Sequence, residues 1–386
     1  MYILKLIFRN AFRHKLRTSL TIVGVAIAIL AFGLLRTVIT TWYLGVETAS
    51  ANRLVTRNAV SLVFPLPLSH KDKIRQIEGV KNVSYGTWFG GIYIDEKHFF
   101  ANFAMQPQSY LAIAPEIVIP SNQKTAFFRD RKSAVAGRKL AERYGWKIGD
   151  IITLKGTIFH GNWDFVLRGI YKGRDQNVDE TAFFFHWEYL NETLRKTTHH
   201  SWIDQVGWYL IEITDPEMAA EISQKIDQTF KNSLAETLTE TEKAFTLSFI
   251  SMTEAIVIAI QLISFVIILI IMAVVANTMA MTARERIGEY AIFKTLGFGG
   301  LHISGLILGE SLFITLLGTA FGIILTFPAA KIFSKTLSAY FPVFNITRET
   351  IYLDIVASFI VAFVATIFPA WRAIKIRIAD GLRRIG

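Results

Sequence analysis

Residues 281–300 read MTARERIGEYAIFKTLGFGG and join two long apolar segments of the chain. The charged residues of this stretch alternate in sign: Arg284, Glu285, Arg286, Glu289 and Lys294. Its apolar side is supplied by Ile287, Tyr290, Ala291, Ile292 and Phe293. This pattern predicts a short amphipathic helix across a lipid interface, and Gly297 is expected to end it, because glycine adopts left-handed backbone conformations. Such a helix can act as a lever between two spans; the alternative is an ordinary loop whose positive charge keeps it in the cytoplasm.

The composition indicates an integral membrane protein. Of the 386 residues, 52% are hydrophobic and 30 are Phe, which is more than a soluble domain usually carries. The net charge of +10 does not indicate nucleic-acid binding, because the basic residues gather beside apolar segments, where they set topology and meet anionic lipid. The absence of cysteine excludes a disulfide framework and a thiolate metal site. We therefore expect membrane lipid, and no nucleic acid, among the partners.

Four apolar segments are long enough to cross a bilayer, which takes about 20 helical residues. The spans are expected at residues 19–45, 251–283, 301–328 and 351–370. The second span is expected to continue as a stalk beyond the bilayer, because residues 255–283 carry no formal charge. No convincing small-residue cleavage site follows the first apolar segment, so we interpret it as a retained span and not as a signal peptide.

The basic residues predict the orientation of the spans. Residues 1–18 carry four of them at successive spacings of four: Lys5, Arg9, Arg13 and Arg17. This spacing predicts one amphipathic helix in the plane of the membrane. Residues 1–18, the 284–300 connection and the 371–386 tail are all rich in Lys and Arg, so all three, and both termini, are expected in the cytoplasm. Residues 46–250 and the loop 329–350 are then extracytoplasmic.

In residues 46–250 charged residues return and no apolar run is long enough to cross a membrane. This composition predicts a large folded α+β domain of two lobes. Helices are expected at residues 69–78 and 138–144, the second closed by Gly145, and after Asp215 and Pro216. Strands are expected at residues 80–89, 91–95, 151–154, 165–171 and 206–214. Residues 231–249 are expected to be helical and to form the stalk. The predicted fold class is a membrane protein with four transmembrane helices and an α+β extracytoplasmic domain between spans one and two.

The large domain carries few candidates for catalysis. His199 and His200 are adjacent and have no carboxylate at metal-ligand spacing, so a zinc site is disfavoured. The aromatic residues 183–185 and Trp187 fit a contact with a lipid-like substrate or a partner, but core packing is the favoured interpretation. No GxSxG or HExxH motif occurs. The domain is therefore expected to bind or to transmit, not to hydrolyse.

The third span combines small residues with one carboxylate. Glycines spaced four apart permit close helix contacts in two places: Gly305, Gly309, Gly318 and Gly322. Glu310 lies in the same span, where a carboxylate must face protein, water or a partner charge. It is either a proton or substrate site or a structural hydrogen-bonding group, and we favour the structural role.

Several motifs, in this order along the chain, resemble those of the MacB and FtsX family of ABC-transporter permeases. Residues 137–141 with Gly149 and Asp150 are similar to the signature of the family's extracytoplasmic core domain. Its hallmark region is similar to residues 284–289 and 294–297, followed by Gly309, Glu310 and the glycines at 318 and 322. Residues 369–373 and 381–383 resemble its carboxyl tail. The resemblance covers essentially the whole chain.

The resemblance implies a type VII, or mechanotransmission, permease of the bacterial inner membrane. In that family two four-span subunits pair, as two copies or as paralogues, and two ATPase subunits dock beneath them. By position, the ATPase-coupling interface would comprise Arg284, Glu285, Arg286, Glu289, Tyr290, Lys294 and Gly297. Because the sequence has no GxxxxGK[ST] motif, ATP and magnesium are expected on a separate ATPase chain. No directly bound cofactor and no catalysis by the permease itself are expected.

The substrate is left open among three functions. Export of an amphiphile with a periplasmic adaptor is preferred, because a domain of this size fits the efflux and lipoprotein-release branches of the family better than the cell-division branch. Extraction of lipoproteins, together with a lipoprotein chaperone, is the second function, and non-transporting signalling to a cell-wall hydrolase is the third. A stand-alone secondary carrier is disfavoured, because the four spans show no inverted repeat.

Overall fold

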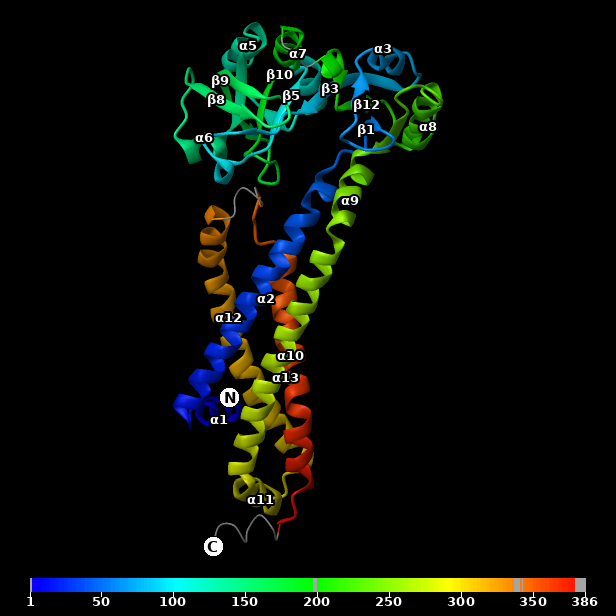
Figure 1. The fold of residues 1–386 in the computed structure, drawn as a ribbon. Helices are drawn as coiled ribbons and strands as arrows, with labels where there is room; N and C mark the ends of the chain where they lie inside the picture. The colour runs from blue at the N-terminus through cyan, green and yellow to red at the C-terminus, as the bar shows by residue number, and fades with distance from the viewer. Residues whose placement is uncertain (1, 197–199, 337–340, 342, 379–386) are drawn as a thin grey trace. The chain divides into compact units, whose positions relative to one another are not determined.

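The computed structural model describes residues 2–196, 200–336, 341 and 343–378 (Figure 1). The chain divides into two compact units, which we call the membrane unit and the sheet unit. The membrane unit comprises Met1–Thr41, Thr253–Thr336 and Phe344–Gly386. The sheet unit comprises Trp42–Met252 and Leu337–Val343.

Within the described residues, the membrane unit is built from α1 (Tyr2–Ala11), α2 (Lys15–Thr48), α10 (Glu254–Glu285), α11 (Ile287–Thr295), α12 (Gly300–Thr336) and α13 (Arg348–Lys375). Four of the described helices, α2, α10, α12 and α13, are long and apolar enough to cross a bilayer. A large mixed domain lies in the chain between the first and the second of them, so the predicted fold class is confirmed.

The amino-terminal segment differs from the prediction of one helix over residues 1–18. The first helix, α1, ends at Ala11, and α2 begins at Lys15. The hydroxyl of Thr18 donates to the carbonyl of Ala11 and so holds the turn between the two helices. Because the chain turns here, Arg13 and Arg17 do not continue one helical face from Arg9.

Glycines of α12 bring the spans close together. A Cβ added to Gly318 would lie 2.6 Å from Cβ of Val25, and one added to Gly322 would lie 2.8 Å from the carbonyl oxygen of Ala26, so α2 crosses α12 at these two positions. At Gly309 an added Cβ would lie 2.7 Å from Cδ1 of Ile7 in α1. Gly305 takes no part in this packing, because nothing in the described chain lies within 4 Å of its added Cβ.

One mixed sheet organises the sheet unit. In the described residues its strand order is β13 (Thr237–Thr241), β1 (Arg53–Asn58), β12 (Trp208–Ile213), β3 (Val80–Trp88), β5 (Asn102–Met105), β10 (Phe183–His186), β7 (Ser133–Gly137), β9 (Gly161–Gly173), β8 (Ile151–Gly156) and β4 (Gly91–Ile92). The short β6 (Ile117–Val118) pairs with β9, and β2 (Leu66–Pro67) pairs with β11 (Gln205–Val206). The pairs β5–β10 and β7–β9 are parallel, and the others are antiparallel.

The helices of the sheet unit, within the described residues, are α3 (His70–Arg75), α4 (Pro107–Ile113), α5 (Ser121–Arg129), α6 (Arg138–Tyr144), α7 (Trp187–Lys196), α8 (Ala219–Thr229) and α9 (Glu242–Met252). The described residues of this unit also form three 3-10 turns: η1 (Glu96–His98), η2 (His200–Trp202) and η3 (Pro216–Met218). The predicted helix at residues 138–144 is present, and Gly145 closes it with a left-handed φ of 68°.

The central strand β10 supplies aromatic side chains to both faces of the sheet. Phe183 and Phe185 belong to the larger apolar core of the unit, whereas Phe184 belongs to a second core on the opposite face. The rings of Phe165 and Phe185 lie 4.4 Å apart between centroids. Trp187 is buried as well. The aromatic cluster is therefore core, and it offers no surface to a substrate.

The prediction of a helix over residues 231–249 is wrong. Residues Thr237–Thr241 form β13, which pairs antiparallel with β1, and the helix α9 begins only at Glu242. The sequence TLTET alternates and is rich in the β-branched residue Thr, which favours a strand. The hydroxyls of Thr56 in β1 and Thr239 in β13 lie 2.9 Å apart across the pair.

A buried arginine joins the start of β1 to two other segments of the sheet unit. The guanidinium of Arg53 lies 2.5 Å from a carboxylate oxygen of Glu116 and 2.8 Å from one of Glu242. Glu242 is the first residue of α9 and also accepts from the backbone N–H of Ser50 at 2.7 Å. Burial raises the pKa of Glu242, and the charge of Arg53 opposes that rise.

We expect Arg53→Met to destabilise the sheet unit by about 3–5 kcal/mol, because two carboxylates lose their buried cation. The measurement is chemical unfolding of the full chain in detergent, followed by tryptophan fluorescence. Arg131→Met is the matched control: Arg131 pairs with Glu188 and Glu192 at the surface, where removing an ion pair costs only about 0–1 kcal/mol. Equal losses in the two variants would contradict the role given to Arg53.

We expect the folded protein to lose stability in mild acid because of His70. Its ring is buried and stacks on Phe230 with centroids 3.8 Å apart, and burial, aided by Lys73, lowers its pKa from 6.5 to about 4. Between these two pH values the unfolded chain binds a proton that the folded chain does not, so stability falls as the pH is lowered through this window, by up to about 3 kcal/mol.

His70→Phe keeps the stack on Phe230 and removes the titrating group. We therefore expect the difference between urea midpoints at pH 7 and pH 5 to shrink in this variant. Part of the difference remains, since burial also lowers the pKa of His186. An unchanged pH dependence would show that His70 is not the group responsible.

Candidate coupling site

The helix between spans two and three, α11, is nine residues long and has a well-defined end. Gly297 has a left-handed φ of 89°, and its N–H donates to the carbonyl of Lys294 at 3.1 Å. The N–H of Phe298 donates to the carbonyl of Phe293 at 3.0 Å, and the rings of these two residues are in contact. This is a Schellman motif with its accompanying apolar contact. The start differs from the predicted one, because Arg284 and Glu285 are the last two residues of α10.

A buried ion pair ties the start of α11 to α12. The guanidinium of Arg286 lies 2.8 Å from a carboxylate oxygen of Glu310, and each side chain is only 6% exposed. Arg286 also donates to the carbonyl of Asn10 at the end of α1, at 3.1 Å. Glu310 therefore has its partner charge within this chain, which supports the structural role expected for it. The sequence indicated both residues but not their pairing.

The amino-terminal segment supplies a second set of charged contacts. Arg17 donates two hydrogen bonds to the two carboxylate oxygens of Glu285, at 2.9 and 2.8 Å, and His14 lies 3.3 Å from the same carboxylate. Arg13 forms an ion pair with Glu289 in α11. These side chains are partly exposed, so each pair contributes about 1 kcal/mol or less. These exposed ion pairs help to orient α11, whereas the buried Arg286–Glu310 pair holds the helix in place.

The last charged contact joins α11 to the end of α13. The ammonium of Lys294 donates to the carbonyls of Ile374 and Ile376, at 2.6 and 2.7 Å. These carbonyls belong to the last turn of α13 and the residue that follows it, where main-chain oxygens lack helical partners and a cation is favourable. We call the three sets of contacts, to the amino-terminal segment, to α12 and to α13, the α11 clamp.

Apolar packing completes the clamp. Tyr290 is buried in a small cluster with Ala283 of α10, Ile303 and Ile307 of α12, and Ala373 of α13. Burial raises the pKa of Tyr290 to about 12, so the phenol is neutral at physiological pH. Tyr290, like Arg286, is buried and contacts other parts of the membrane unit. The role of these two residues in coupling to an ATPase stays a prediction.

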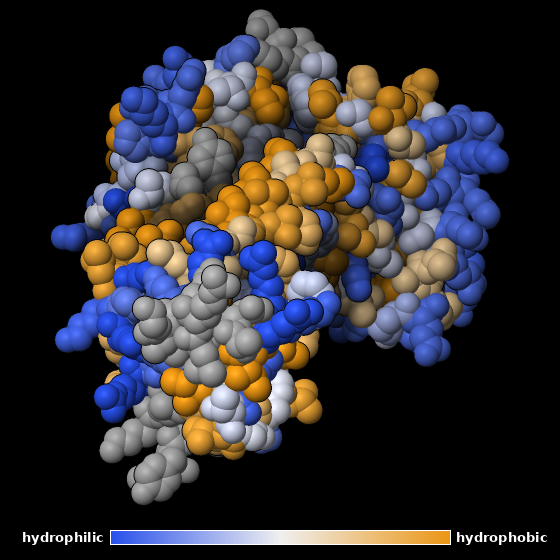
Figure 2. Space-filling view, turned by 90° about the horizontal axis from the view of Figure 1, so that it is seen from below, coloured by the Kyte–Doolittle hydropathy of each residue, from blue (hydrophilic) through white to orange (hydrophobic). Residues whose placement is uncertain are grey.

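Most residues that the sequence suggested as an ATPase interface take part in the α11 clamp. Glu285, Glu289 and Lys294 bind other parts of the membrane unit, and Gly297 ends the helix. Arg284 has no ion pair within the described chain. The exposed side chains around the end of α11 include three large apolar ones: Ile292, Leu296 at 69% exposure and Phe298 at 46%. Figure 2 views the end of the membrane unit where α11 lies, and apolar and charged residues are interspersed there.

A second acidic side chain lies within a span. Asp354 of α13 is buried, and its Oδ1 has no hydrogen-bond partner. In the described chain no basic nitrogen lies within 4 Å of its carboxylate. It faces α2, since a Cβ added to Gly33 would lie 3.2 Å from its Oδ2. The sequence analysis missed this residue, although a lone carboxylate in an apolar run is itself a signal.

The described residues show no catalytic arrangement. Among them no group of three or more His, Asp or Glu side chains is placed to hold a metal ion. The side chains of His199 and His200 lie outside the residues whose side chains the structure describes, as do residues 379–386 of the tail. The ion pairs and hydrogen bonds of the α11 clamp hold one short helix against the ends of several spans.

The fold and the α11 clamp define a polytopic membrane protein whose short inter-span helix is fixed to its neighbours. Residues 261–378 match the family of the FtsX-like permease C-terminal region. The chain is 23% identical, over 402 residues, to an uncharacterized ABC transporter permease of Methanocaldococcus jannaschii, and the match covers 97% of this chain and 96% of that protein. The chain is an ABC-transporter permease of the FtsX type.

Further similarities are more distant. An uncharacterized ABC transporter permease protein of Mycobacterium tuberculosis is 23% identical over 280 residues, which cover 68% of this chain and 31% of that protein. The periplasmic region of MacB from Actinobacillus actinomycetemcomitans matches with a TM-score of 0.38 and 8% identity, over 53% of this chain and 95% of that one. The extracellular domain of the transporter YknZ matches with a TM-score of 0.37 and 10% identity, over 49% and 100%. The assignment rests on the family match and the sequence relatives.

Glu310→Ala should destabilise the full chain by about 3–5 kcal/mol, because the buried guanidinium of Arg286 loses its counter-ion. Replacing both partners by apolar residues, as in Arg286→Met with Glu310→Leu, should recover most of this loss. The measurement is thermal unfolding in detergent of the wild type, Glu310→Ala, Arg286→Met, Glu310→Leu and the double variant. Additive losses in this double-mutant cycle would mean that the two residues do not stabilise each other.

Proposed function

We propose that this permease receives the movement of an ATPase at α11 and passes it through the membrane to the sheet unit. The observation that carries the proposal is the α11 clamp. A helix of nine residues bound to the amino-terminal segment, to α12 and to α13 moves together with them or breaks the buried Arg286–Glu310 pair. Because breaking that pair costs about 3–5 kcal/mol, joint movement is favoured.

Two helical connections support transmission beyond the bilayer. The 34 residues of α2 make a helix of about 51 Å, longer than the hydrocarbon core of about 30 Å, and it ends in the sheet unit. Only Thr253 separates α9 from α10. In the sheet unit Arg53, five residues after α2, binds Glu242, the first residue of α9. A displacement of either helix therefore reaches the same ionic junction.

An ABC-transporter permease works with an ATPase, and we propose that ATP and magnesium bind to that partner chain. Its docking surface on this chain would be the exposed apolar end of α11: Ile292, Leu296 and Phe298. We further propose a dimer with a second copy or a paralogue, residence in the cytoplasmic membrane, and both termini on the side of the ATPase. The basic residues around the α11 clamp support this orientation.

For the substrate we propose export of an amphiphile, with an adaptor on the outer side. The proposal is supported by two loops of the sheet unit that a hydrogen bond links. The loop after β1 exposes Val60, Val63 and Phe64, and the loop before β13 exposes Leu234. The N–H of Ala59 donates to the carbonyl of Glu236 at 2.9 Å, which holds the two loops together. Exposed apolar groups of this kind suit an apolar ligand or partner. Lipoprotein release and signalling to a cell-wall hydrolase are the alternatives.

Leu296→Asp should reduce the ATPase recovered with the tagged full chain from native membranes at least about 10-fold, because it places a charge in an apolar contact. Its thermal unfolding should be unchanged, since Leu296 is exposed. Glu289 and Lys294 are less suitable positions, because their loss also loosens the clamp.

Leu234→Asp is the matched control, with the same substitution at an exposed leucine of the sheet unit. It should leave the recovery of the ATPase unchanged. The other chains recovered, whether an adaptor, a lipoprotein chaperone or a hydrolase, distinguish the three substrate functions. Full recovery of the ATPase with Leu296→Asp would refute the docking surface.

A further inference from the structure

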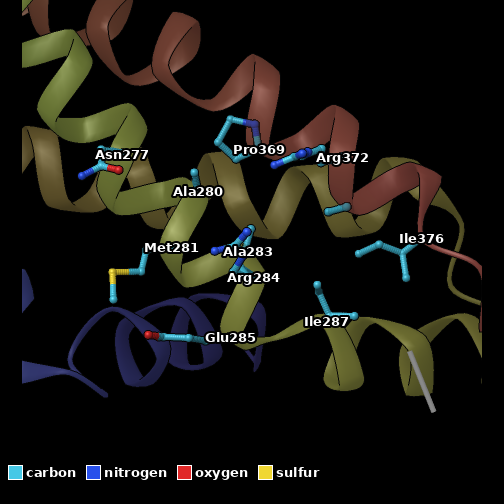
Figure 3. Close-up of a pocket in the computed structure, with 11 residues that line it drawn as sticks. Asn277, Ala280, Met281, Ala283, Arg284, Glu285, Ile287, Pro369, Arg372 and Ile376 are labelled. Atoms are coloured by element: carbon cyan, nitrogen blue, oxygen red, sulfur yellow. The ribbon is translucent and has the colours of Figure 1, made fainter. Parts of the chain in front are cut away.

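A groove with two unpaired arginines lies at the end of the membrane unit where α11 begins. Its volume is about 660 Å³, and it lies between the last turns of α10 and α13 and the first residue of α11 (Figure 3). Arg284 and Arg372 line it, together with Asn277 and apolar side chains that include Met281 and Pro369. In Figure 3 both guanidinium groups lie in the space between the two helices.

These two arginines differ from the other arginines of this region. Arg286, Arg17 and Arg13 each bind a carboxylate, whereas Arg284 and Arg372 have none within 4 Å in the described chain. The guanidinium of Arg372 lies 5.1 Å from the ring centroid of Phe368. Glu285 also lines the groove, but both of its oxygens accept hydrogen bonds from Arg17. The groove therefore offers two cationic donors that no carboxylate of the described residues pairs with.

The position of the groove indicates the level of the lipid headgroups. Arg284 is the second-last residue of α10, and Arg372 lies in the last turn of α13, so both stand at the ends of membrane-crossing helices. Trp371 is exposed beside Arg372, as is typical of side chains at a membrane–water interface. On the span side of the two arginines the groove is lined by apolar Ala280, Met281 and Pro369 and by the polar Asn277.

We propose that this groove binds an anionic phospholipid, with its phosphate between Arg284 and Arg372 and an acyl chain along the apolar side of the groove. Guanidinium groups bind phosphate oxygens through charge-assisted, often bidentate, hydrogen bonds. The amide of Asn277 adds a donor for the glycerol or ester oxygens. A water-soluble protein partner would satisfy the arginines but not the apolar side that continues into the spans, so a lipid fits better. The site is independent of the proposed docking of an ATPase.

The test is lipid binding to the purified full chain, measured by native mass spectrometry with phosphatidylglycerol or phosphatidylcholine added at defined concentrations. We expect one phosphatidylglycerol to bind the wild type about 10- to 30-fold more tightly than it binds the double variant Arg284→Gln/Arg372→Gln. Phosphatidylcholine should bind both proteins equally. Arg284→Lys/Arg372→Lys, which keeps the charge, should retain the preference for phosphatidylglycerol.

Arg9→Gln/Lys15→Gln is the matched control, since it removes two exposed cations of the amino-terminal segment that do not line the groove. It should bind phosphatidylglycerol as the wild type does. Equal binding by the wild type and the glutamine variant would overturn the proposal. Competition by millimolar inorganic phosphate would overturn it in favour of a free-anion site. Loss of the copurified ATPase with unchanged lipid binding would overturn it in favour of a protein contact.

Discussion

A guanidinium and a carboxylate buried in an apolar helix bundle must be paired, and the arrangement around α11 depends on one such pair, Arg286 with Glu310. Neither charge is tolerable there alone, so the junction between α10 and α11 stays against α12 whenever the membrane unit is folded. That constraint brings Glu285 and Glu289 within reach of the amino-terminal arginines and Lys294 within reach of α13. The exposed contacts are weak individually, and they become effective because the buried pair has already placed the helix.

The sheet unit uses a related device. Arg53 is buried near the end of α2, and it holds Glu242 at the start of α9 and Glu116 beside β6. In each unit a buried arginine therefore stands where the chain passes from a long helix to its next element, and it fixes segments that are distant in sequence. A protein that transmits movement needs stiff joints between its helices, and a buried polar network whose members are all satisfied rigidifies its surroundings.

The features that could be predicted from the sequence are those that residues close together in the chain determine. The charge-free runs predict the spans, Gly145 and Gly297 predict the ends of α6 and α11, and the aromatic residues 183–185 predict core packing. Prediction from the sequence fails where a structural feature depends on segments that are far apart in the chain. Residues 237–241 become a strand only because β1 lies beside them, and the pairing of Arg286 with Glu310 depends on the packing of α12. The contacts that these residues make within the chain could not be predicted from the sequence, and their contact with an ATPase stays a prediction.

The ammonium of Lys294 binds two main-chain carbonyls, not side chains. Every amino acid carries that carbonyl, so residues 374 and 376 are free to vary during evolution without losing the contact. A method that infers proximity from paired substitutions has a signal to detect in Arg286 and Glu310, but none in Lys294 and its acceptors. We therefore expect one attachment of α11 to leave two co-varying positions in a family of sequences, and the other to leave only a conserved lysine.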